Sequence, residues 1–118
     1  MILSIIIKYK ALDSNNYLKY YRNILFDFRD RYELKISDIE FLFFVYDMDF
    51  FTGLTIAKDY RCSNSFITRN LPKLMSKGYV KIYLEKAHNR ARRYMISQRG
   101  KILVTKFYRE LKEYNYGL

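Results

Sequence analysis

The chain has 118 residues, the length of one domain, and half of them are hydrophobic, so it can bury a core without metals or disulfides. A single cysteine and a single histidine exclude an internal disulfide and argue against a metal site, so we expect no cofactor. No stretch reaches the roughly 18 consecutive apolar residues of a membrane span, and the apolar start lacks the features of a signal peptide. We therefore expect a cytoplasmic protein with no membrane partner.

The net charge of +10 is concentrated in the second half of the chain. Residues 1–60 have a balance of −1, whereas residues 61–118 have a balance of +11, with 14 Lys and Arg against 3 Asp and Glu. Such asymmetry is typical of a protein that binds a polyanion, either nucleic acid or an anionic membrane. The alternative is a basic surface that only improves solubility.

Apolar residues at alternating spacings of three and four predict a helix over residues 17–32, which Asn15 and Asn16 can start. The apolar stripe of this helix is wide enough to contact more than one neighbour, including a second subunit. The apolar residues 1–7 fit either a core strand or the first turns of a helix that packs on a partner chain.

Ser37 and Glu40 form a capping-box pattern that predicts a helix over residues 38–47. Because its inner side is almost entirely apolar, we expect this helix to be the centre of the core. The inner residues are Ile39, Leu42, Phe43, Val45 and Tyr46. A short helix follows, capped by Thr52 or Thr55 and ending near residue 60.

Ser63 is a candidate N-cap for a helix over residues 64–77, which Gly78 ends. Residues 80–84 and 93–97 alternate between apolar and polar side chains, which predicts two strands joined by a basic turn. Ser97 then caps a last helix over residues 98–114.

This order predicts a mainly α-helical fold with a small β-hairpin, the arrangement of a winged helix-turn-helix. We expect one winged-helix domain over residues 1–118. Its helix-turn-helix and hairpin, the wing, occupy residues 37–97, and helices in residues 1–36 and 98–118 flank them.

A specific pattern of residues runs from 56 to 97. It consists of Ile56, Ala57, Tyr60, Cys62, Ser63, Phe66, Ile67, Thr68, Arg69, Leu71, Leu74 and 77–80 in the helix-turn-helix, and 90–97 in the wing. This pattern resembles the MarR family of bacterial regulators, including its SarA-type relatives. The resemblance implies a sequence-specific transcriptional regulator, most simply a repressor, whose partner is double-stranded DNA. It also implies a homodimer formed by the first and last helices. Few Ala, Gly and Pro with many Lys, Ile, Tyr and Asn indicate an A·T-rich genome, so we expect a bacterial or phage-infected cell.

Recognition helices place their N-terminal residues against base edges in the major groove. The expected base-reading residues here are Asn64, Ser65, Thr68 and Arg69, beside the cap Ser63. Asparagine suits adenine and arginine suits guanine. Lysines suit phosphates, which raise affinity without selecting sequence, and the candidates are Lys73, Lys77 and Lys81.

The wing is expected to enter the minor groove through Lys86, His88, Arg90, Arg92 and Arg93. Three positions depart from the family pattern. His88 replaces the aspartate that braces the wing arginine, and Arg61 stands where the turn often has glycine. Pro72 lies inside the recognition helix, where it either kinks the helix or marks a shorter helix that begins near Asn70.

Alternatives remain open for the role of Cys62 and for the function of the chain. Cys62 fits a packing residue in the turn better than a redox sensor, because free cysteines are usually buried. The sequence contains no nucleophile–base pair, phosphate loop or paired acids, so we expect no enzyme. One alternative function is a winged-helix protein-interaction or structural module, for example of a phage, whose basic half meets an acidic protein. The other is a non-specific nucleic-acid binder.

Overall fold

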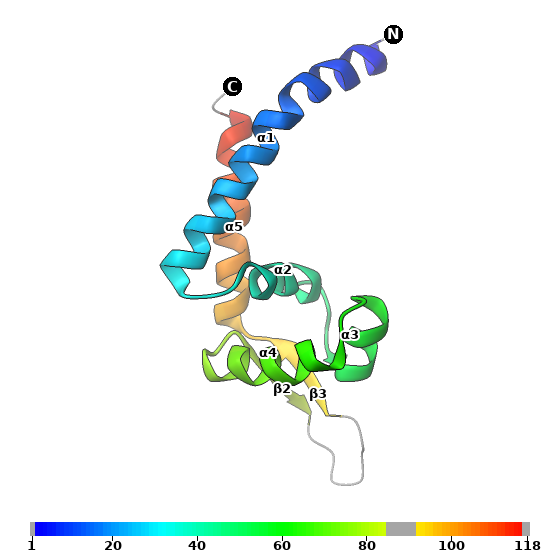
Figure 1. The fold of residues 1–118 in the computed structure, drawn as a ribbon, viewed down its shortest axis with the longest axis vertical. Coiled ribbons are helices and arrows are strands. Elements are labelled where there is room, and N and C mark those ends of the chain that lie inside the picture. Colours follow the sequence, from blue (N-terminus) through cyan, green and yellow to red (C-terminus); the bar gives the residue numbers. More distant parts are fainter. Residues whose placement is uncertain (1, 85–91, 117–118) are drawn as a thin grey trace. The chain divides into compact units, whose positions relative to one another are not determined.

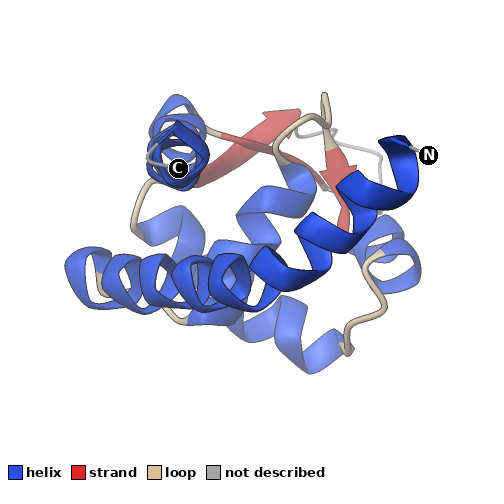
Figure 2. Cartoon of the chain, turned by 90° about the horizontal axis from the view of Figure 1, so that it is seen from above, coloured by secondary structure: helices blue, strands red, loops and turns tan. Residues whose placement is uncertain are grey.

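The computed structural model describes residues 2–84 and 92–116 of the chain (Figure 1). In this part of the chain, helices predominate and the strands form one small sheet (Figure 2). The elements are α1 (Ile2–Tyr32), α2 (Ile36–Val45), β1 (Phe51–Thr52), α3 (Gly53–Asp59), α4 (Asn64–Ser76), β2 (Val80–Leu84), β3 (Arg93–Ile96) and α5 (Gln98–Tyr116). The predicted mainly helical architecture with a β-hairpin is confirmed.

The chain divides into two compact units. One, which we call the helical unit, consists of Met1–Ile36 and Lys106–Leu118. The other, the central unit, consists of Ser37–Thr105 and holds the sheet and the helices α2, α3 and α4. No helix among the described residues is long and apolar enough to cross a membrane.

The first helix is longer than predicted, because α1 begins at Ile2 and not at Asn15 or Asn16. Of the two alternatives for residues 1–7, the core strand is therefore wrong, and residues 2–7 form the first turns of a helix. Residues 1–16 contain no proline or glycine that would end a helix, so the asparagines are accommodated within it.

The core of the helical unit is built from aromatic rings on α1 and the end of α5. Phe28 is fully buried, and its ring meets that of Phe107 edge-on with centroids 5.2 Å apart. Tyr20 donates a hydrogen bond from its hydroxyl to the Glu110 carbonyl at 2.9 Å. Leu18 lies in the predicted apolar stripe of α1 but is 61% exposed, so the stripe extends beyond what this unit covers.

Two sequence predictions about α2 are wrong. The helix begins at Ile36, so Ser37 lies inside its first turn and does not cap it. The helix also ends at Val45, which leaves Tyr46 39% exposed. The predicted core role holds for Ile39, Leu42 and Val45, which are all completely buried.

A capping box does occur one helix later, at the start of α3. The Thr55 backbone N–H donates to the Thr52 hydroxyl at 3.1 Å, and the Thr52 backbone N–H donates to the Thr55 hydroxyl at 2.9 Å. Each side chain satisfies a backbone donor that the helix leaves unpaired. The prediction of a threonine cap for this short helix is confirmed.

The sheet contains a strand that the sequence did not predict. Its order is β1-β3-β2, and the two-residue β1 pairs Phe51 with Tyr94 and Thr52 with Arg93. Both predicted strands are present as β2 and β3. Their register slips by one residue, which makes Tyr83 an extra residue, a β-bulge, in β2.

The start of α5 is fixed to the start of β2. Ser97 accepts a hydrogen bond from the Gly100 backbone N–H at 3.1 Å, which confirms Ser97 as the predicted cap. Ser97 also donates from its own backbone N–H to the Tyr79 carbonyl at 2.9 Å. These bonds fix the first turn of α5 to the residues that follow α4.

Candidate nucleic-acid interface

Helix α4 begins where the sequence predicts and ends one residue earlier, at Ser76. The Ser63 hydroxyl accepts from the Phe66 backbone N–H at 3.1 Å, so Ser63 is the N-cap. Gly78 follows the helix with φ of +82°, a left-handed conformation that favours glycine. Pro72 lies within one continuous helix, so the alternative of a shorter helix that begins near Asn70 is wrong.

The N-terminal half of α4 presents polar side chains to solvent. Asn64, Ser65, Thr68 and Arg69 are all exposed, as is the cap Ser63. Thr68 donates from its hydroxyl to the Asn64 carbonyl at 2.8 Å, and Arg69 donates from Nε to the Ser65 carbonyl at 3.4 Å. Because this bond uses only Nε of Arg69, the terminal N–H groups of its guanidinium can still form a bidentate pair with guanine.

The three predicted phosphate lysines differ in their surroundings. Lys81 on β2 is exposed, and Lys77 is half-buried at the C-terminal cap of α4. The Lys73 ammonium forms an ion pair with the carboxylate of Asp38, whose side chain is completely buried. The structure thus presents Lys81 to solvent and pairs the partly exposed Lys73 with a buried carboxylate.

The base of the hairpin carries two of the predicted wing residues. Arg92 is exposed, whereas Arg93 is half-buried with its guanidinium 4.8 Å from the centre of the Phe50 ring. Phe50 stacks in turn on Tyr83, with ring centroids 5.3 Å apart. The other predicted wing residues, Lys86, His88 and Arg90, lie outside the described residues.

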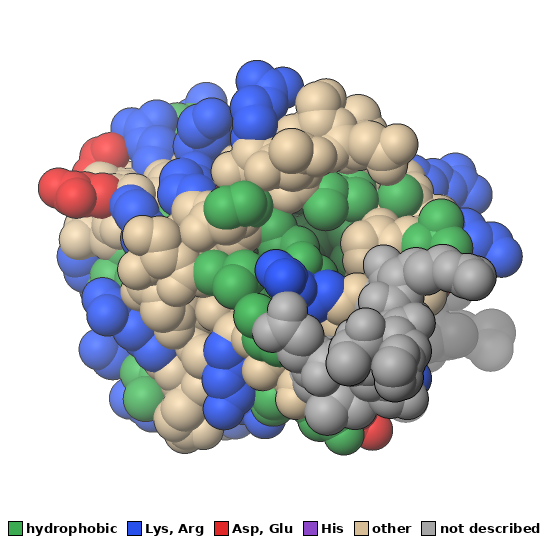
Figure 3. Space-filling model, turned by 90° about the horizontal axis from the view of Figure 1, so that it is seen from below, with side chains coloured by type: hydrophobic (Ala, Val, Ile, Leu, Met, Phe, Trp, Pro, Cys, Tyr) green, Lys and Arg blue, Asp and Glu red, His purple; other side chains and the backbone are tan. Residues whose placement is uncertain are grey.

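This part of the central unit carries exposed cationic side chains, among them Arg69, Lys81 and Arg92. Figure 3 shows Lys and Arg side chains around a hollow lined by hydrophobic side chains, with few acidic side chains in view. Such a surface attracts polyanions through long-range electrostatics.

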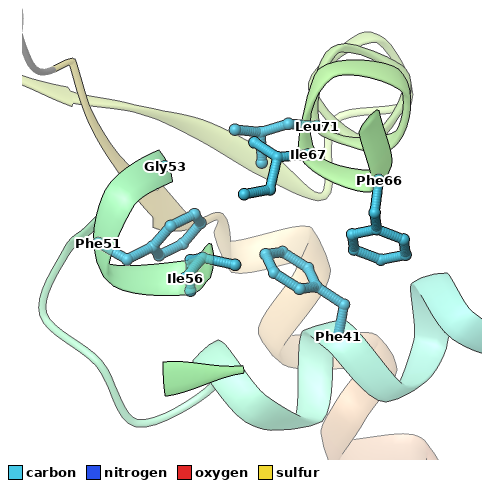
Figure 4. Close-up of a pocket in the computed structure, with 7 residues that line it drawn as sticks. All are labelled: Phe41, Phe51, Gly53, Ile56, Phe66, Ile67 and Leu71. Carbon is cyan, nitrogen blue, oxygen red and sulfur yellow. The ribbon is translucent and has the colours of Figure 1, made fainter. Parts of the chain in front are cut away.

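A small apolar cavity lies behind α4 (Figure 4). It is lined by Phe41, Phe51, Gly53, Ile56, Phe66, Ile67 and Leu71, which come from α2, β1, α3 and α4. The centre of a water molecule can occupy a volume of about 10 Å³ in this cavity, so the cavity has room for about one water. Its size and apolar lining make it a packing defect of the core, too small for an organic ligand.

The turn between α3 and α4 contains Arg61 and Cys62. Arg61 adopts φ of +57°, the left-handed conformation that a glycine supplies in similar turns. Cys62 is half-buried, its thiol points to the Ile56 carbonyl at 3.9 Å, and burial raises the pKa of that thiol. A raised pKa leaves less reactive thiolate, which supports the packing role over the redox role.

The role of Asp38 in this region was not predicted from the sequence. Its carboxylate pairs with the ammonium of Lys73 on α4. One signal was available, since Asp38 adjoins Ile39 and precedes Leu42 on a helix whose other inner positions are apolar. A charge at the edge of such a face needs a partner, although the sequence does not identify it.

Comparison of the sequence with protein-family models gives no match, and comparison with characterised proteins also gives none. Solved structures do match the fold. MepR from S. aureus in complex with DNA gives a TM-score of 0.66 at 15% identity, over 94% of this chain and 86% of that one. Reduced AbfR bound to DNA gives 0.65 at 12% identity, over 96% and 83%.

MarR from E. coli, in its apo form, gives a TM-score of 0.66 at 13% identity, over 83% of this chain and 72% of that one. The chain therefore has the winged helix-turn-helix fold of MarR, MepR and AbfR. At the level of fold, the resemblance to the MarR family that the sequence indicated is confirmed.

Proposed function

We propose that this protein is a sequence-specific, double-stranded DNA-binding transcriptional regulator that acts as a repressor in the cytoplasm. The observation that carries the proposal is the exposed polar half of α4 on a strongly basic face of the central unit. The likeness to MepR and AbfR, which were solved bound to DNA, supports it.

In this proposal, α4 enters the major groove with its N-terminus towards the bases. Arg69 forms a bidentate pair with a guanine, and Asn64 pairs with an adenine. Ser65 and Thr68 contact base edges or phosphates, and Ser63 contacts the DNA backbone beside the helix cap. These contacts rest on the exposure of all five side chains.

Phosphate contacts supply most of the affinity. Lys77 and Lys81 lie at the end of α4 and on β2, and Arg92 and Arg93 lie at the base of the hairpin. The wing residues Lys86, His88 and Arg90 complete the set by entering the minor groove. Because each neutralised phosphate releases counterions, we expect DNA affinity to fall steeply as salt rises.

We further propose that the protein binds DNA as a homodimer formed through α1 and α5. Leu18 on α1 is 61% exposed, and Tyr108 on α5 is 60% exposed. Where such exposed apolar side chains form a contiguous patch, they mark a surface that a partner subunit covers. A two-fold dimer reads a near-palindrome with half-sites about one helical turn apart.

Selection of bound duplexes from a random pool, at near-physiological salt, tests the proposed function. We expect an enriched near-palindrome. Binding without a preferred sequence would point to a non-specific nucleic-acid binder, and the absence of binding would point to a module that binds an acidic protein. Either of these results would overturn the proposal.

A further inference from the structure

The central unit contains one buried charged side chain among the described residues. Asp38, in the first turn of α2, has no exposed surface, and its neighbour Ile39 belongs to the core. The carboxylate is paired with the ammonium of Lys73, whose side chain is 31% exposed. The pair therefore links the central core helix to α4.

An ion pair in this position is a poor way to gain stability. Removing a carboxylate from water is costly, and attraction to one lysine returns that cost only when the geometry is good. Apolar residues of similar size stabilise such a site equally well or better. What a charge pair adds is a directional constraint, since the buried Asp38 carboxylate is unfavourable without its lysine partner.

The constraint acts on the part of α4 that faces DNA in the proposed function. Lys73 lies four residues after Arg69, so the two side chains leave the helix within about 40° of each other around its axis. The rotation of α4 that lets Lys73 reach Asp38 thus also sets the direction of Arg69. Pro72 has no backbone N–H to donate beside Lys73. One hydrogen bond of the helix is therefore missing here, and the backbone alone constrains the helix geometry less.

We propose that Asp38 and Lys73 are positioning residues that fix the orientation of α4 for base recognition, and that Lys73 does not bind phosphate. This inference rests on the proposed function, because the orientation of α4 matters only if α4 reads DNA. It reassigns one of the three lysines that the sequence placed on the DNA backbone, and it gives Asp38 a role in specificity from outside the interface.

The test compares Lys73→Met and Asp38→Asn with Lys81→Met, the control for an exposed phosphate lysine. Each variant is titrated with the selected duplex and with a scrambled duplex over a range of salt. Lys81→Met is expected to weaken both duplexes equally and to lower the salt slope by about one. Lys73→Met and Asp38→Asn are expected to weaken only the selected duplex, about tenfold, with an unchanged slope.

The double variant Asp38→Asn/Lys73→Met is expected to bind no more weakly than Asp38→Asn alone, because both changes break the same contact. The inference is overturned if Lys73→Met lowers the salt slope like Lys81→Met, or if Asp38→Asn leaves discrimination between the duplexes intact.

Hydrogen exchange on the free protein separates this inference from the proposed function. Amides of α4 are expected to exchange at least tenfold faster in Lys73→Met and Asp38→Asn than in the wild type, and unchanged exchange would overturn the inference.

If Asp38→Asn does not fold, Asp38→Leu/Lys73→Met replaces it, since an apolar pair restores packing. That variant is expected to fold and to lose discrimination, and retained discrimination would overturn the inference. A wild-type protein that prefers no duplex would refute the proposed function instead.

Discussion

Gly100 shows how one residue sets the position of a whole element. It is buried in the first turn of α5, where a Cβ atom would lie against the Tyr79 carbonyl oxygen and only 2.6 Å from the Ile96 Cγ1 atom. The carbonyl is backbone and already accepts the Ser97 N–H, so it cannot move aside cheaply. The absence of a side chain lets α5 pack directly on the sheet.

We therefore expect Gly100→Ala to lower the free energy of unfolding by about 3 kcal/mol, measured by urea denaturation. Gly53→Ala is the matched control, because a Cβ at Gly53 meets Ile67 at an ordinary 3.7 Å and extends towards the apolar cavity. The control is expected to raise the free energy of unfolding by about 0.5 kcal/mol. Equal effects of the two substitutions would contradict this account of the packing of α5.

At the residue scale, sequence patterns predicted contacts that are local in the chain. Ser63 and Ser97 bond to backbone N–H groups three residues ahead, so their roles follow from spacing alone. The pairing of Asp38 with Lys73 joins residues 35 positions apart. No local rule connects them, and the same lysine fitted a phosphate contact equally well from the sequence.

Among the elements, α4 is the one whose sequence conflicts most with its structure. It remains a single helix although Pro72 cannot donate to the Thr68 carbonyl. Pro72 is exposed, so its ring contributes little to the core. The helix therefore relies on its cap and on its buried face, which includes Leu71 and Leu74.

Pro72→Ala is expected to restore that hydrogen bond, which stabilises the folded protein. Alanine also leaves the unfolded chain more flexible than proline does, which offsets part of this gain. The net result is a rise in the free energy of unfolding of about 1–2 kcal/mol. The measurement is the melting temperature together with urea denaturation. Ser76→Ala, an exposed change in the same helix, should alter stability by less than about 0.5 kcal/mol. A destabilised Pro72→Ala protein would show that the helix needs the proline geometry.

Element types were more predictable than element boundaries. The two strands of the hairpin and the helices α3, α4 and α5 follow from periodicity and from caps. The start of α1 did not, because no residue before Asn15 breaks a helix and the asparagines resemble a cap. The strand β1 has two residues, which is too short for any alternation, and only its pairing with β3 defines it.

At the scale of the whole molecule, the exposed apolar side chains of α1 and α5 predict self-association. Leu18→Glu and Tyr108→Glu are expected to convert a dimer into a monomer, because each places a charge in the proposed interface. Light scattering after size exclusion measures the mass. Leu54→Glu is the control, since Leu54 is 80% exposed but belongs to α3, and it should leave the dimer intact. A wild-type monomer would contradict the proposed assembly.

The substitution Arg69→Ala is the most direct test of whether α4 reads bases. The affinities of wild type and Arg69→Ala are measured for the selected duplex and for duplexes that carry each single base change. Arg69→Ala is expected to weaken the selected duplex by about 1–3 kcal/mol and to lose discrimination at one guanine per half-site. Uniform weakening of all duplexes, or no weakening at all, would contradict the claim that α4 reads sequence.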